Sequence, residues 1–103
     1  MIFEITASGY LIMDANVASR YFPNDAMTSR VSESMLLLYP LTSALNGGLL
    51  LKVRDSQANR SCCLSELLRD IDFAPGLHFG SFDSGAHVVK LNLNVSEVDV
   101  SCQ

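Results

Sequence analysis

Apolar and polar residues are grouped in short blocks along the chain, and the blocks predict a mostly antiparallel sheet. The segments 1–5 (MIFEI) and 9–13 (GYLIM) contain β-branched and aromatic residues around small polar ones, which predicts a hairpin. A continuous apolar run at 35–39 predicts a strand that is buried on both faces, and a second apolar run at 49–53 predicts its antiparallel partner, so that the two strands form the centre of the sheet. The Asn-Gly-Gly loop at 46–48 suits the reversal between them, because these residues tolerate positive φ.

Two segments have the spacing of short helices. Asp14 stands at an N-cap position before ANVASRYF at 15–22, and the Pro-Asn-Asp sequence at 23–25 ends that helix. The second segment has Ser65 as its N-cap and Pro75-Gly76 as its stop. Its apolar residues follow the i, i+3, i+4, i+7 pattern of a helix: Leu64, Leu67, Leu68 and Ile71.

The last third of the chain predicts a further hairpin, and its turn at 83–85 allows two registers. In the register that we favour, Gly85 takes the left-handed position of a three-residue loop, and Phe79 faces Val89. This choice keeps one apolar set on the buried side: Leu77, Phe79, Val89 and Leu91. A two-residue loop instead places His78 opposite Leu91. The alternation at Val98 and Val100 predicts a short final strand.

Together these elements predict an α+β fold, with a mostly antiparallel sheet of five to seven strands and two short helices. A half-open barrel is an alternative arrangement of the same strands. The 103 residues suit a single compact domain over 1–103 with one hydrophobic core. An apolar fraction of 49% with only 17% charged residues predicts a folded chain, and it favours a second subunit that covers part of the apolar surface.

Charge and hydropathy exclude some partners. Seven basic residues are scattered along the chain against eleven acidic ones, giving a net charge of −4, so a nucleic-acid partner is not expected. The first residues lack a basic leader, and no apolar run approaches the roughly 20 residues of a membrane-spanning helix. We therefore expect a cytoplasmic protein that does not bind membranes.

The sequence RSCC at 60–63 carries the most conspicuous reactive groups. Adjacent strand residues point to opposite faces, so Cys62 and Cys63 cannot share a metal, and we interpret them as packing residues. His78 and His87 lie on opposite faces of the last hairpin in the favoured register. A pair of His87 with either cysteine stays open as a nucleophile and base. No metal site, cofactor or catalytic residue is predicted.

These observations leave two main hypotheses for function. The first is a small acidic, non-catalytic interaction or accessory module that binds a protein partner or itself, as a homo-oligomer, through a strand edge or apolar face. The second is a small-molecule-binding protein or small enzyme with a pocket between helix and sheet. The residues expected in that pocket are Leu68, Phe79 and Phe82, with His78, Arg54 or a cysteine as the polar group. A third alternative is an acidic surface that covers a basic partner, as in toxin neutralisation.

Overall fold

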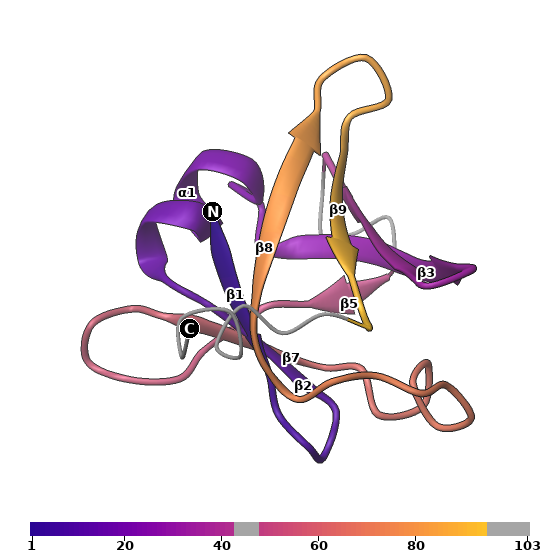
Figure 1. Ribbon diagram of the computed structural model, residues 1–103. Coiled ribbons are helices and arrows are strands. Elements are labelled where there is room, and N and C mark those ends of the chain that lie inside the picture. Colours follow the sequence, from indigo (N-terminus) through magenta and orange to yellow (C-terminus); the bar gives the residue numbers. More distant parts are fainter. Residues whose placement is uncertain (43–47, 95–103) are drawn as a thin grey trace, which may run out of the picture.

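The computed structural model describes residues 1–42 and 48–94, in which nine antiparallel strands form one sheet that curls into a nearly closed barrel (Figure 1). The strands are β1 (Ile2–Ile5), β2 (Tyr10–Met13), β3 (Ala26–Ser32), β4 (Met35–Pro40), β5 (Leu49–Leu50), β6 (Lys52–Val53), β7 (Arg60–Cys63), β8 (Gly76–Asp83) and β9 (Val88–Asn92). Their order across the sheet is β5-β3-β4-β9-β8-β1-β2-β7-β6. The predicted final strand at 98–100 lies outside the described residues.

One predicted helix is confirmed. Helix α1 (Ala15–Tyr21) begins after Asp14, whose carboxylate accepts a hydrogen bond of 2.8 Å from the backbone N–H of Val17. This N-cap satisfies one of the free donors of the first turn. The helix connects β2 to β3 in the chain. Val17 and Ala18 are buried, so its apolar side packs against the core.

The α+β prediction with two helices is wrong, because the described residues form nine strands and one helix. The segment 65–70 consists of turns. Leu64 still belongs to the sheet, since its N–H donates to the carbonyl of Gly9 at 2.8 Å. The Cα of Ser65 packs so closely on Gly9 that a Cβ there would lie 2.9 Å away. Leu68 is therefore buried from a series of turns. The segment is too short for the hydrogen bonds of a helix to offset the cost of nucleating it.

The predicted centre of the sheet is also wrong. Strand β4 has buried leucines at 36–38 as expected, but its neighbours are β3 and β9. The run 49–53 divides at Leu51 into β5, which pairs with β3, and β6, which pairs with β7. Strand β5 is the first strand in the sheet order and β6 is the last. Because only Leu51 separates them along the chain, the two edges of the barrel nearly meet at this point.

The β8–β9 hairpin has neither of the predicted registers. Phe82 pairs with Val89 and Asp83 with Val88, which leaves a four-residue loop at 84–87. The Asp83 carboxylate accepts hydrogen bonds from the N–H groups of residues 85 and 86, at 3.0 and 3.2 Å. His87, with φ of 54°, takes the left-handed conformation expected at Gly85. The carboxylate cap thus permits a longer loop than the glycine position suggests.

Because of this register, the face of strand β8 that is buried is the one predicted to be exposed. Leu77 and Phe79, predicted to be buried, are 39% and 55% exposed, whereas His78 is 1% exposed. Gly80 faces the core, where a Cβ would lie 2.6 Å from the ring of Phe3. Because a shift of one residue exchanges the two faces of a strand, the close packing of Phe3 on a glycine selects the face opposite to the hydrophobic pattern.

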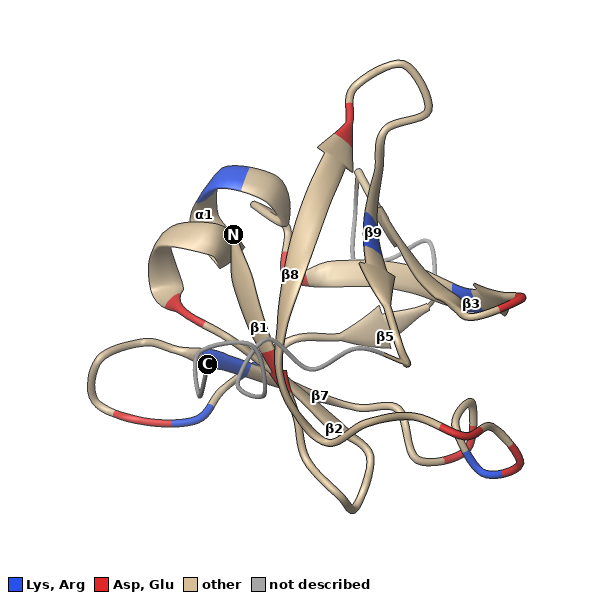
Figure 2. Ribbon diagram, viewed as in Figure 1, with Lys and Arg blue, Asp and Glu red and all other residues tan. Residues whose placement is uncertain are grey.

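Charged residues are distributed over loops, strand ends and positions within strands (Figure 2). Three ion pairs join described residues, of which Arg60 with Asp25, at 2.9 Å, links β7 to the start of β3. In the part of the chain that the structure describes, no helix has the length and hydrophobicity needed to cross a bilayer.

Candidate functional site

The barrel is incomplete along a seam between β3 and β7. Strand β3 runs from Ala26 to Ser32, but β5 covers only its first two residues. Strand β7 ends at Cys63, and β6 pairs only with its residues Arg60 and Ser61. Within the described residues, no strand pairs with the outer edge of 28–32 or with that of Cys63. Two sheet edges therefore border one gap.

Backbone alternation identifies the groups that face this seam from β3. The carbonyl of Asp25 accepts from Leu51 N–H at 2.8 Å, and that of Ala26 accepts from Leu41 N–H at 3.0 Å. Successive residues of a strand direct their backbone polar groups to alternate edges, so the even-numbered residues of β3 face β4. The N–H and C=O groups of Ser29 and Val31 accordingly face the seam. No described strand satisfies them.

The same reasoning applies to β7. Leu64 donates toward Gly9 on the β2 side, so the backbone groups of Cys63 point to the opposite edge. Continuing the pairing of Lys52 with Ser61 would place Leu50 opposite Cys63. Leu50 pairs with Ala26 of β3 instead. The segment 49–53, which could close the barrel if all of it paired with β7, therefore stops pairing with β7 at Leu51.

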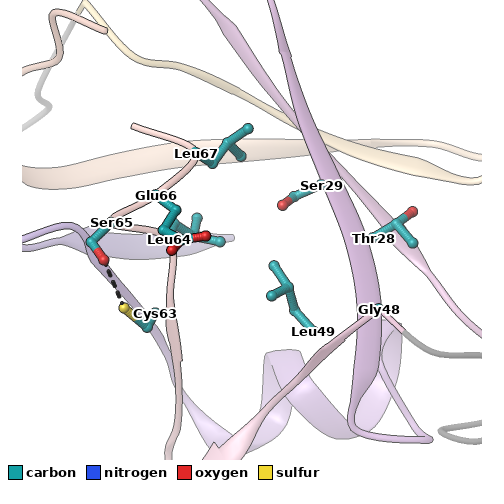
Figure 3. A pocket seen from close by; sticks show the side chains of 9 residues that line it. All are labelled: Thr28, Ser29, Gly48, Leu49, Cys63, Leu64, Ser65, Glu66 and Leu67. Carbon is teal, nitrogen blue, oxygen red and sulfur yellow. Dashed lines mark hydrogen bonds between the residues drawn. The ribbon is translucent and has the colours of Figure 1, made fainter. Parts of the chain in front are cut away.

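A cavity of about 820 Å³ occupies the seam. Its lining residues are Thr28, Ser29, Gly48, Leu49, Cys63, Leu64, Ser65, Glu66 and Leu67. Figure 3 shows the Ser29 and Leu49 side chains on one side and the 63–67 segment across from them. Three leucines make the wall apolar, while hydroxyl groups, a thiol and one carboxylate lie around them. The cavity is open to solvent along its length, which suits an extended chain better than a small enclosed ligand.

The Cys63 thiol is the most reactive group of the seam. Its sulfur lies 3.1 Å from the hydroxyl oxygen of Ser65. Hydrogen bonds from the Ser65 hydroxyl and backbone N–H stabilise the thiolate and lower the pKa of Cys63 from its ordinary value of 9.0. Glu66 raises it in part, because its negative charge disfavours the thiolate. No histidine is among the lining residues described, so the thiol has no imidazole base beside it.

The predicted opposite orientation of the two adjacent cysteines is confirmed. Cys62 is buried in the core cluster and Cys63 is exposed, and both are free thiols. Burial raises the pKa of Cys62 to about 11. The described residues contain no group of three or more His, Cys, Asp or Glu side chains that could hold a metal ion.

The five side chains predicted to line a pocket do not come together. His78 is buried, with its ring nitrogens 2.9 Å from the carbonyl oxygen of Asn92 and 2.6 Å from that of Ala74. This residue ties β9 to the segment before β8. Phe79 lies on the outer face, Arg54 is exposed beside a turn, and Leu68 belongs to the core.

Phe82 alone of the five lines one of the larger cavities, a second one that lies between α1 and the sheet. The polar groups of this cavity differ from those predicted.

The sequence singled out Cys63 of the seam as a reactive group, but it did not indicate that Ser29 and Leu67 would lie near it. Ser29 and Leu67 are ordinary residues of a strand pattern and a helix pattern, and the unpaired edge that makes them notable depends on where β5 stops.

Comparisons of this chain with protein-family models, curated proteins and solved structures give no match, so the site is interpreted from its own geometry.

Proposed function

We propose that this chain is a non-catalytic interaction module that accepts an extended segment of a partner protein as an additional strand along β3. The observation that carries the proposal is the edge of 28–32, which no strand among the described residues pairs with, beside an open cavity. Sheet edges of this kind bind peptides through main-chain hydrogen bonds, and adjacent pockets select alternate side chains. The unpaired groups of Ser29 and Val31 supply such bonds.

The lining of the cavity indicates the chemistry of the incoming segment. Its inward-facing side chains would be apolar, because they would meet the leucines of the seam: Leu49, Leu64 and Leu67. Its outward-facing side chains would be polar, since they lie in solvent. A basic residue beside Glu66, whose carboxylate is 91% exposed, would add a weak attraction. Proline would be disfavoured where the segment must donate to the carbonyl groups of β3.

Hydrogen exchange tests the first requirement, which is that the edge is open. In the free protein we expect slow exchange at the amides of Thr28, Arg30 and Ser32, which face β4, and fast exchange at Ser29 and Val31. Equal and strong protection of all five amides would show that another segment already fills the edge, and the proposal would then fail.

Selection of peptides tests binding. A display library of random peptides of about twelve residues is selected on the wild-type chain, and the winners are measured against two variants. Ser29→Pro removes an N–H that faces the seam and leaves the β4 ladder intact, so it should weaken binding about tenfold. Ser32→Ala, the control, should bind like the wild type, since it changes only an exposed side chain that does not line the cavity.

The position of binding gives the decisive readout. Peptides that bind as proposed protect Ser29 and Val31 from exchange and contain alternating apolar residues. If these two amides become protected with rising concentration of the chain alone, the occupant is a second copy. Peptides that bind Ser29→Pro as tightly as the wild type, or that protect amides elsewhere, would contradict strand addition along β3.

A further inference from the structure

A second cavity, of about 480 Å³, lies between the end of α1, the end of β4 and the β8–β9 hairpin. It is separate from the seam, and none of its lining residues is shared with the seam cavity. Its volume is within the usual range of small-molecule sites. What it could bind follows from its rings and its charge.

Three rings gather at this cavity. The rings of Tyr21 and Phe82 have centroids 5.1 Å apart and are tilted by 47°. His87 meets Phe82 edge to face, with centroids 5.5 Å apart and an angle of 82°. Both distances are within the range of favourable aromatic contacts. Pro23 and Pro40 add two rigid apolar surfaces to the lining. A flat ring would find aromatic faces and edges here.

The charge of the cavity is opposite to that of the whole chain. Although the net charge is −4, no Asp or Glu is among the described lining residues, whereas Arg20 is. The Arg20 guanidinium carbon lies 5.4 Å from the centroid of the Tyr21 ring. Two nearby carboxylates are paired with other cations, Asp83 with Lys90 at 3.3 Å and Asp25 with Arg60 at 2.9 Å. An anionic group beside Arg20 therefore meets a cation without a competing carboxylate in the lining.

We infer that this cavity binds a small planar aromatic carboxylate, whose ring packs among Tyr21, Phe82 and His87 while its carboxylate bonds to Arg20. Guanidinium groups bind carboxylates in a planar, two-point geometry, and the placement of Arg20 over an aromatic ring restricts the motion of its side chain. The site is independent of strand addition at the seam, because it uses different elements of the barrel.

Titration of the ¹⁵N-labelled chain with 2-naphthoate tests the inference. We expect saturable chemical-shift changes confined to the amides of residues 20–22, 24, 41, 42, 82 and 87, with a dissociation constant of about 1 mM or tighter. The neutral analogue 2-naphthamide should bind at least tenfold more weakly, because it lacks the charge that pairs with Arg20. Equal binding of acid and amide, or changes spread over other residues, would overturn the inference.

Two arginine variants separate the specific contact from general electrostatics. Arg20→Met should remove the preference for the acid over the amide, and the exposed position of Arg20 makes folding of this variant safe. Arg30→Met is the matched control, because Arg30 also lies over a tyrosine ring, 5.9 Å from the centroid of Tyr39, but outside this cavity. Loss of the acid preference in both variants would show that only the overall charge matters and would overturn the inference.

A further variant tests the aromatic part. His87→Gly removes one ring of the wall, and glycine suits the positive φ at this exposed position, so the variant should still fold while binding 2-naphthoate several-fold more weakly. Unchanged binding would contradict the ring contact.

A free aromatic acid and a C-terminal phenylalanine present the same chemistry, so 3-phenylpropionate and acetyl-Ala-Ala-Phe are compared. Tighter binding of one of them identifies the source of the ligand, and failure of all these acids to bind would overturn the inference.

Discussion

From β4 through β9, β8, β1 and β2, every strand has a neighbour along both of its edges, whereas β3 and β7 each have an edge that β5 and β6 only begin to cover. On the continuous side, Phe3 packs closely against Gly80, and His78 lies between two carbonyl groups. The seam contains a large open cavity and an exposed thiol.

This difference distinguishes the region that stabilises the fold from the region that is available for binding. Close-packed, fully hydrogen-bonded regions supply most of the free energy of unfolding, and binding sites are drawn from the less constrained parts of a fold. A substitution of a buried residue on the continuous side should therefore destabilise the fold, while a substitution of an exposed side chain in a loop or at the seam should change stability little.

The largest effect is expected at His78. The His78→Leu variant removes the buried ring nitrogens that face the carbonyl oxygens of Asn92 and Ala74, and leaves these acceptors without a partner from residue 78. The expected loss is about 3 kcal/mol in the free energy of unfolding, measured by urea denaturation. The matched control is His87→Asn in the exposed loop, which retains a residue suited to positive φ and should change stability by less than about 0.5 kcal/mol. Similar losses for the two histidines would contradict the division.

Gly80 should show the next largest effect. A methyl group at this position would lie 2.6 Å from the buried ring of Phe3, so Gly80→Ala should cost about 2 kcal/mol through overpacking. At Gly85, in the loop, the nearest atom to an added Cβ is a carboxylate oxygen 3.4 Å away. Gly85→Ala should therefore leave the urea midpoint nearly unchanged. A larger loss at Gly85 than at Gly80 would mean that Phe3 packs elsewhere.

Gly80 also explains how far the sequence could predict this fold. The strands at 2–5, 10–13 and 35–40 and the helix after Asp14 follow directly from local patterns, because each has a clear periodicity or cap. The face of β8 could not be predicted in this way. Its hydrophobic residues lie at 77 and 79, and only the tertiary contact between Phe3 and a glycine turns them outward.

The turns at 65–70 illustrate a second limit. Leu64, Leu67 and Leu68 have helical spacing, and Leu68 N–H donates to the Leu64 carbonyl at 2.9 Å as in a helical turn. The following bonds, from Arg69 to Glu66 and from Ile71 to Leu68, span only three residues, so the helical ladder does not continue. A pattern of side chains does not reveal where the backbone ladder stops. The seam is a third case. The apolar run 49–53 predicts one strand, but the division at Leu51 between two partners creates the site, and it depends on barrel closure.

The finest comparison lies within one dipeptide, because Cys62 faces the core and Cys63 the solvent. In the folded protein near neutral pH, iodoacetamide should label Cys63 and leave Cys62 unlabelled until denaturant is added, as followed by mass spectrometry of the digested chain. The reason is both access and ionisation, since Ser65 lowers the pKa of Cys63 and burial raises that of Cys62. Equal labelling rates would show that the seam is no more open than the core.

Cys62 and Cys63 should also differ in how they affect the pH dependence of the free energy of unfolding. Between pH 9.0 and about 11, the unfolded chain releases the Cys62 proton while the folded chain retains it, because the folded pKa is raised to about 11. Stability should therefore fall as pH rises through this window. Tyrosine and lysine side chains also titrate there, so the informative quantity is the difference in slope between variants, measured by urea denaturation at several pH values. Cys62→Ala should reduce the slope more than Cys63→Ala, because burial is the largest cause of the raised pKa of Cys62 and the charge of Cys63 is a smaller one. An unchanged slope in Cys62→Ala would place that thiol in contact with water and would remove the distinction between the two sides of β7.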